Sequence, residues 1–292
     1  MEFKEKLQKY IEIIDSALGK YLPEGGICPE ILGEAMRYSL FAGGKRLRPV
    51  ILLASCEAFG GRTEDALAFA CAMEMIHTYS LIHDDLPAMD NDDFRRGKLT
   101  NHKVYGEAMA ILAGDGLLSL AFEIMSDAAC KNPLGIRAMR EIARGAGVFG
   151  MVCGQAADII NENKEIDEET LKFIHNNKTA AMIRAAFGAG AILGGAKDED
   201  VKRLIAAGEK VGLGFQIQDD ILDVAGDFER LGKPVKSDEK NRKSTFVALY
   251  GLEKSEKMAN DAFIQAEKYV DEIWGEGNFL KNIIKFTSKR EC

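Results

Sequence analysis

Apolar residues recur every three or four positions along most of this chain, which is the spacing of one face of an α-helix. Phe3, Leu7 and Tyr10 begin the pattern. It continues through the segments 30–42, 48–59, 64–83, 104–129, 134–153, 167–193, 198–224 and 255–273. The alternation that a half-buried strand requires is nowhere convincing. The sequence therefore predicts an all-α fold of about ten helices.

The breaks between these segments are short and contain helix-ending residues. They fall at 23–26, 60–61, 132–133, 194–195 and 232–234, where Gly or Pro interrupts the pattern. No tract rich in Ser, Gly or Pro divides the 292 residues, so there is no sign of a linker. Hydrophobic residues make up 47% of the chain, which is enough to form one large core. We therefore expect a single domain over residues 1–292.

Charge and cysteine usage limit the classes of partner. The net charge of −8 argues against a nucleic acid or an anionic membrane as the binding partner. The six cysteines include no C-x-x-C pair, as is usual for buried thiols in a reducing compartment. The charged N-terminus lacks the apolar core of a signal peptide, and no uncharged apolar run reaches the length of about 18 residues that a spanning helix needs. We expect a cytoplasmic protein without a membrane span.

Two acidic clusters whose first residues lie 135 positions apart carry the strongest chemical signal. Both follow apolar sequence, where carboxylates lose hydration and repel one another unless a cation compensates. Their members are Asp84, Asp85 and Asp90 in the first cluster and Asp219, Asp220 and Asp223 in the second. Oxygen ligands without Cys or paired His suit Mg²⁺, which commonly bridges carboxylates and substrate phosphates. The clusters predict a diphosphate held through metal ions.

Basic residues follow the first cluster and also lie upstream of it. Arg95 and Arg96 could be surface ion-pair partners of the aspartates, worth about 0–1 kcal/mol, or could each hold a different diphosphate. The segment from Gly43 to Pro49 contains Lys45 and Arg48 beside two glycines that would let backbone N–H groups approach an anion. Alone, this segment is a weak signal.

Several polar residues interrupt apolar helices near these clusters. His77 lies two helical turns before Asp84, where it could reach a ligand or simply pack in the core. Lys178, Thr179 and Gln216 need polar partners, and each alone is usually structural. Small residues between 185 and 190 permit either a ligand cavity or close helix packing, and these residues alone favour close packing.

Taken together, these motifs resemble the trans-isoprenyl diphosphate synthases, in particular the bacterial short-chain farnesyl diphosphate synthases. The motifs are Gly43-Gly44-Lys45-Arg46-Leu47-Arg48-Pro49, Glu74 to His77, Asp84 to Asp90, Arg95-Arg96-Gly97, Asn177-Lys178-Thr179 and Phe215 to Asp223. The resemblance implies an isoprenoid synthase-type helical bundle around a deep central cavity, a homodimer, and Mg²⁺-dependent condensation of isopentenyl diphosphate with an allylic diphosphate.

The resemblance also implies roles for individual residues. The six aspartates would bind Mg²⁺, three ions in all with the diphosphate bound. Contacts to the allylic diphosphate or its cation would come from Arg95, Lys178, Thr179, Gln216 and Lys233. The isopentenyl diphosphate site would consist of Lys45, Arg48, His77 and Arg96.

Tyr79 and Ser80 are the candidate residues that set the length of the product. Tyr79 lies about 7.5 Å below Asp84 on a helix and could close the prenyl pocket for a fifteen-carbon product, whereas Ser80 is too small to do so. Alternatively, Tyr79 only packs in the core and the product is geranylgeranyl diphosphate.

Two other functions compete with this interpretation. A terpene cyclase typically lacks an all-aspartate second motif and a second diphosphate site. A non-catalytic prenyl-binding subunit would have no need to retain six aspartates.

Overall fold

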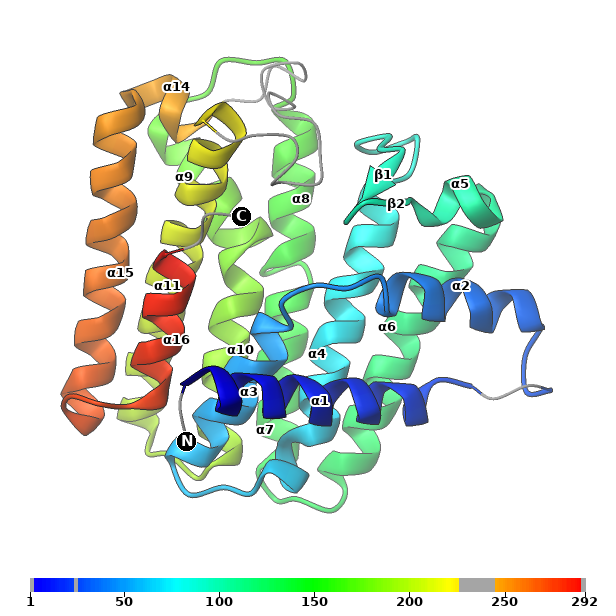
Figure 1. Ribbon diagram of the computed structural model, residues 1–292, viewed down its shortest axis with the longest axis horizontal. Helices are drawn as coiled ribbons and strands as arrows, with labels where there is room; N and C mark the ends of the chain where they lie inside the picture. Colours follow the sequence, from blue (N-terminus) through cyan, green and yellow to red (C-terminus); the bar gives the residue numbers. More distant parts are fainter. Residues whose placement is uncertain (1–2, 24–25, 226–244, 290–292) are drawn as a thin grey trace.

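The computed structural model describes residues 3–23, 26–225 and 245–289, and within them the fold is a bundle of α-helices with one small hairpin (Figure 1). The N-terminal part contains α1 (Phe3–Tyr21), α2 (Glu30–Leu40), α3 (Leu47–Ala58), α4 (Thr63–Asp84), β1 (Phe94–Arg95), β2 (Lys98–Leu99), α5 (Asn101–Tyr105) and α6 (Glu107–Ala129). The remainder contains α7 (Gly135–Ala146), α8 (Met151–Ile160), α9 (Glu168–Lys178), α10 (Ala180–Leu193), α11 (Asp198–Ala225), α14 (Phe246–Tyr250), α15 (Leu252–Trp274) and α16 (Phe279–Ser288). The prediction of an all-α fold is confirmed.

Helix α10 lies in the middle of the bundle, between α3, α7 and α11 (Figure 1). All of its residues except Arg184 are buried. A Cβ atom at Gly190 would lie 2.3 Å from the Leu52 carbonyl oxygen of α3, and one at Gly188 would lie 2.9 Å from the Ile205 side chain of α11. The small residues of this helix therefore serve close packing, as the residues alone favoured.

The structure differs from the sequence prediction at several helix boundaries. The predicted helix 104–129 is divided at Gly106, whose φ of 85° an L side chain rarely adopts. The predicted helix 134–153 is divided between α7 and α8, and α16 was not predicted. The β1–β2 hairpin was missed as well, because its two strands have two residues each and show no alternation to detect.

Helix α6 exposes part of its apolar surface. Ile111 and Leu112 on its outer side are 44% and 51% exposed. By length and composition alone it is the one helix in the described chain that could cross a membrane, with 39% of its apolar window buried inside the molecule. It carries Glu107, Asp115 and Glu123 and packs along α4, so the expectation of no membrane span stays a prediction.

The largest hydrophobic core joins residues from Tyr10 in α1 to Ile284 in α16, which is the arrangement that a single domain requires. The prediction of one domain over 1–292 stays a prediction. Helices α4 and α11 carry the two acidic clusters at their C-terminal ends, and both end towards the upper side of Figure 1. The fold thus places the two clusters at the same end of the bundle.

Candidate active site

The first acidic cluster lies where α4 ends. Helix α4 stops at Asp84, and the chain then turns back so that the Asp90 N–H donates to the Asp84 carbonyl oxygen over 2.9 Å. Pro87 disfavours a helical conformation at Leu86, which explains why the helix does not continue. Asp90 therefore returns to the end of α4 on a turn.

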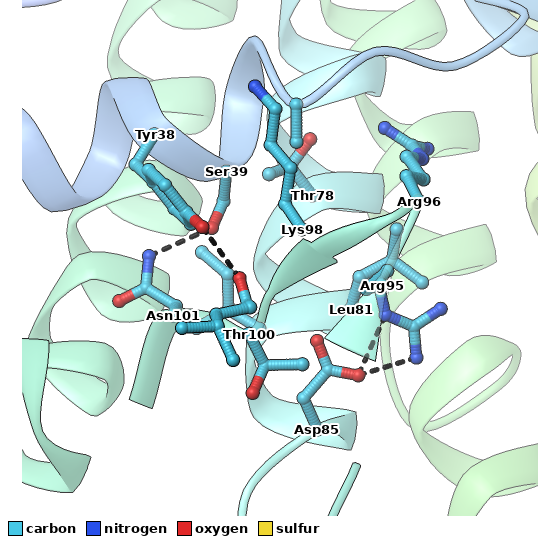
Figure 2. Close-up of a pocket in the computed structure, with 13 residues that line it drawn as sticks. Tyr38, Ser39, Thr78, Leu81, Asp85, Arg95, Arg96, Lys98, Thr100 and Asn101 are labelled. Carbon is cyan, nitrogen blue, oxygen red and sulfur yellow. Dashed lines mark hydrogen bonds and ion pairs between the residues drawn. The ribbon is translucent and has the colours of Figure 1, made fainter. Parts of the chain in front are cut away.

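Asp85 is held by Arg95 of the hairpin. The Arg95 Nε and Nη2 atoms lie 2.7 and 2.6 Å from Asp85 Oδ1, and the aspartate is only 3% exposed (Figure 2). Burial raises the pKa of Asp85 to about 6, although the ion pair with Arg95 acts in the opposite direction. Asp85 therefore fixes the hairpin to α4.

Asp84 meets groups from α8 and α9. Its Oδ1 atom accepts a hydrogen bond from Gln155 Nε2 over 2.5 Å and lies 4.0 Å from Lys178 Nζ. The Lys178 ammonium also lies 2.7 Å from Asp158 Oδ2. Gly154 makes this approach possible, since a Cβ atom there would lie 2.0 Å from the Lys178 backbone nitrogen.

Gln155 and Asp158 are site residues that the sequence analysis missed. They stand three apart in the apolar segment 151–160, so both lie on one side of α8. Two polar residues at this spacing were the available signal, but their partners Asp84 and Lys178 are distant in sequence.

Thr179 and Gln216 extend the contacts to the second acidic cluster. The Thr179 hydroxyl donates to Gln216 Oε1 over 2.8 Å, and Gln216 Nε2 lies 3.3 Å from Asp220 Oδ1. Because Lys178 precedes Thr179 directly, a continuous series of polar residues runs from Asp84 to Asp220. The structure therefore brings together the polar residues that the sequence could only suggest one by one.

Within the second cluster the aspartates differ in exposure. Asp220 and Asp223 are 2% and 4% exposed, whereas Asp219 is half-buried. The Phe246 N–H of α14 donates to Asp220 Oδ2 over 2.9 Å, and His175 Nε2 lies 3.8 Å from the same oxygen. Asp220 therefore connects α11 to α14.

The predicted isopentenyl diphosphate residues lie on the loop before α3, on the first turn of α3, on α4 and on the turn of the hairpin. Arg48 Nη1 is 3.3 Å from His77 Nε2, and Lys45 is exposed. The Arg96 guanidinium donates to the Gly43 carbonyl oxygen and lies against Gly44, where φ is 122° and a Cβ atom would lie 2.8 Å from it. Lys233 lies outside the described residues.

Lys45, Arg48, His77 and Arg96 form a basic cluster. Its environment determines the protonation state of His77. Burial, together with the positive charges of Arg48 and Arg96, lowers the pKa of His77 well below its usual value. The imidazole is neutral near pH 7 and leaves the positive charge to its neighbours. Arg96 points away from Arg95 in Figure 2, and the two adjacent arginines contact different partners, Gly43 and Asp85.

The residues with a predicted role in product length lie on the last two turns of α4. Tyr79 is buried, and its ring meets the His83 ring edge-on with 5.7 Å between centroids. His83 in turn packs against Gly114 of α6, where a Cβ atom would lie 2.2 Å from its Nε2 atom. The Ser80 hydroxyl donates to the His77 carbonyl oxygen over 2.8 Å.

The donor set at the acidic end suits a hard divalent cation. Among the described residues, no group of three or more His, Cys, Asp and Glu side chains is close enough to hold a metal ion by itself. Mg²⁺ needs no such cage, because it usually keeps water ligands and is bound by one or two carboxylates together with substrate phosphates. Asp84 and Asp219, which retain exposure, fit that pattern.

Comparison with known proteins agrees with this arrangement. The family model for polyprenyl synthetase matches residues 29–273. The chain is 43% identical to the farnesyl diphosphate synthase of Geobacillus stearothermophilus, over 100% of this chain and 99% of that protein. It is 48% identical to a geranylgeranyl diphosphate synthase of Cyanophora paradoxa, over 93% and 88% of the two chains. A crystal structure of an FPP/GFPP synthase from Zymomonas mobilis superposes with a TM-score of 0.87 at 37% identity, covering 98% of each chain. The chain belongs to the polyprenyl synthetase family.

Proposed function

We propose that this protein is a prenyltransferase that condenses isopentenyl diphosphate with dimethylallyl or geranyl diphosphate and releases farnesyl diphosphate and inorganic diphosphate. The observation that carries the proposal is the series of polar contacts from Asp84 through Lys178, Thr179 and Gln216 to Asp220. It joins both acidic clusters, and Arg96, a member of the basic cluster formed by Lys45, Arg48, His77 and Arg96, lines a pocket together with Asp85 of the first acidic cluster (Figure 2). The farnesyl diphosphate synthase relatives support the same function.

The allylic diphosphate binds between the two acidic clusters. The metal-binding residues we assign are Asp84, Asp85, Asp90, Asp219, Asp220 and Asp223. Bound Mg²⁺, three ions in our proposal, supplies positive charge that stabilises the departing diphosphate. Arg95, Lys178 and Lys233 add charge on the protein side, and each close unit-charge pair contributes on the order of 4 kcal/mol at an effective dielectric constant of about 20.

The oxygen atoms of Thr179 and Gln216 have a different task. They lie between the clusters and are already hydrogen-bonded to one another over 2.8 Å. Fixed dipoles of this kind stabilise the positive charge that develops on the allylic carbon without having to reorganise during the reaction. Neither residue forms a covalent bond to the substrate.

The second diphosphate is bound by side chains rather than by metal ions. Lys45, Arg48 and Arg96 supply the charge, and neutral His77 supplies a hydrogen bond. The double bond of isopentenyl diphosphate attacks the allylic carbon, and the departing diphosphate takes up the proton that is then lost. The protein thus orients two substrates and excludes water, and no side-chain nucleophile is needed.

We propose Tyr79 as the residue that limits the product to fifteen carbons. Its buried ring, supported by His83, lies five residues before Asp84 on α4, in the direction in which a growing tail extends. The geranylgeranyl diphosphate synthase relatives make the twenty-carbon product the second candidate.

We also infer that two copies of the chain form a homodimer through the outer face of α6. Ile111 and Leu112 expose large apolar side chains on this face, and an identical helix would cover them. Light scattering should give twice the chain mass of 32.0 kDa, and Leu112→Asp should halve it. A dimer that survives Leu112→Asp would place the interface elsewhere.

We assign the enzyme to the cytoplasm, which the five free cysteines of the described chain support.

The function is tested with the purified protein, isopentenyl diphosphate, geranyl diphosphate and Mg²⁺. We expect farnesyl diphosphate and one equivalent of inorganic diphosphate, and no turnover after addition of a chelator. A cyclic hydrocarbon formed from the allylic substrate alone would identify a terpene cyclase. Tight binding of both diphosphates without turnover would identify a non-catalytic subunit.

A further inference from the structure

Arg46 stands between two residues of the basic cluster, yet its side chain points into the protein. It is 4% exposed, whereas its neighbour Lys45 is exposed. The guanidinium donates to Asp15 Oδ1 over 2.9 Å, to Glu74 Oε1 over 2.8 Å and to the Leu40 carbonyl oxygen over 2.8 Å. These contacts join the loop before α3 to α1, to α2 and to α4.

The backbone at Arg46 is unusual as well. Its φ is 48°, in the left-handed region that side chains other than glycine rarely adopt. Such a conformation persists only where surrounding contacts hold it. Here the three hydrogen bonds of the guanidinium hold it. Lys45 precedes this point on the loop, and Arg48 follows it in the first turn of α3.

Glu74 gives this anchor a defined relation to the rest of the site. It is 2% exposed and lies on α4, one turn before His77, which contacts Arg48 over 3.3 Å. Ten residues further along the same helix is Asp84, at about 15 Å for a rise of 1.5 Å per residue. One rigid helix therefore carries the loop anchor, a member of the basic cluster and the first acidic cluster.

Charge pairing alone does not require this arrangement. Removal of one partner from a buried ion pair leaves an uncompensated charge, but replacement of both partners by apolar residues of similar size often costs little stability. Apolar residues cannot supply directional hydrogen bonds, however. The Arg46–Glu74 pair therefore provides what apolar residues cannot, which is a fixed position of the loop on α4.

Resting on the proposed function, we propose that Arg46 and Glu74 are positioning residues that fix the isopentenyl diphosphate site relative to the metal-binding carboxylates. The pair locks the loop so that Lys45 and Arg48 meet His77 and Arg96 around one diphosphate. Neither Arg46 nor Glu74 touches the substrate. Their loss displaces the second substrate and leaves the binding of the allylic diphosphate intact.

The test uses the double variant Arg46→Met, Glu74→Met in the full-length enzyme, with KM measured separately for each substrate. We expect the KM for isopentenyl diphosphate to rise at least tenfold, the KM for geranyl diphosphate to stay within twofold, and the circular dichroism spectrum to remain that of a folded helical protein. Arg46→Lys keeps the charge but loses the planar fork, so it should raise the KM for isopentenyl diphosphate as well. Lys281→Met, which removes the α15–α16 ion pair with Asp271, is the matched control and should change neither KM.

An unchanged KM for isopentenyl diphosphate in the double variant would overturn the proposal, and so would an equal rise for both substrates. If the double variant fails to fold, Arg46→Lys decides by the same criterion. Wild-type enzyme without condensing activity would instead refute the proposed function, so the two failures are distinguishable.

Discussion

Replacement of Tyr79 by alanine should lengthen the product. The ring is 8% exposed and sits about 7.5 Å before Asp84 along α4, so its removal opens space below the metal-binding end of the helix. One more isoprene unit adds five carbons, which gain up to about 4 kcal/mol when buried at about 0.8 kcal/mol each. At 1.4 kcal/mol per decade this favours binding of the longer chain by up to roughly a thousandfold.

The assay is chromatography of the dephosphorylated prenyl alcohols formed from isopentenyl and geranyl diphosphates. We expect geranylgeranyl or longer chains from Tyr79→Ala. Tyr79→Phe, which keeps the ring, and Ser80→Ala, whose hydroxyl only contacts the His77 carbonyl, should still give the fifteen-carbon product. The new cavity should lower stability by about 3–5 kcal/mol, so thermal unfolding is recorded in parallel. Unchanged product from folded Tyr79→Ala would show that another residue closes the pocket, and a twenty-carbon product from the wild type would refute the length assignment.

Three further predictions concern charge. Asp84→Ala and Asp219→Ala should each lower turnover by at least about 100-fold with unchanged circular dichroism, because loss of a carboxylate relieves repulsion; a fully active Asp219→Ala enzyme would contradict the metal assignment. Arg96→Ala and Lys45→Ala should raise the KM for isopentenyl diphosphate about 10- to 100-fold, which corresponds to the free energy of one charge-assisted hydrogen bond. A rise in the KM for geranyl diphosphate only would show that the two substrate sites are assigned the wrong way round. Burial lowers the pKa of His175 from 6.5 to about 4. Between these pH values the unfolded chain binds more protons than the folded one, so the contribution of His175 to stability, up to about 3 kcal/mol, is lost as pH falls from 6.5 to 4. Urea unfolding of the metal-free wild type and of His175→Gln should show a weaker pH dependence of the unfolding free energy in the variant. An equal pH dependence in both proteins would refute this prediction.

Much of the fold was predictable because long helices leave a periodic apolar pattern. The C-terminal end of α4 was predictable to within one residue, at 83 against the observed Asp84, since Pro87 acts locally on Leu86. The division of the helix at Gly106 was missed because only its positive φ, a structural property, distinguishes it from tolerated helical glycines. The hairpin was missed because its four strand residues are held by Arg95 contacts to α4 rather than by a strand pattern.

The site was predictable by residue type but not by partner. Lys178, Thr179 and Gln216 were identified as polar residues in apolar helices, yet their order of contact depends on how α9 meets α8 and α11. Gln155 could not be connected with Asp84 from the sequence because 71 positions separate them. The inward direction of Arg46 was hidden for a related reason, since its neighbours Lys45 and Arg48 have the same charge and only the tertiary structure shows which cation is buried.

We propose that the two diphosphates are bound by different means, one through Mg²⁺ and the other through side chains. Calorimetric titration of the wild-type protein with each diphosphate, with and without Mg²⁺, tests this most directly. We predict that geranyl diphosphate binds only when Mg²⁺ is present, because carboxylates otherwise repel it, whereas isopentenyl diphosphate binds in both conditions. Equal affinity for geranyl diphosphate without Mg²⁺, or binding of isopentenyl diphosphate only in its presence, would contradict the account.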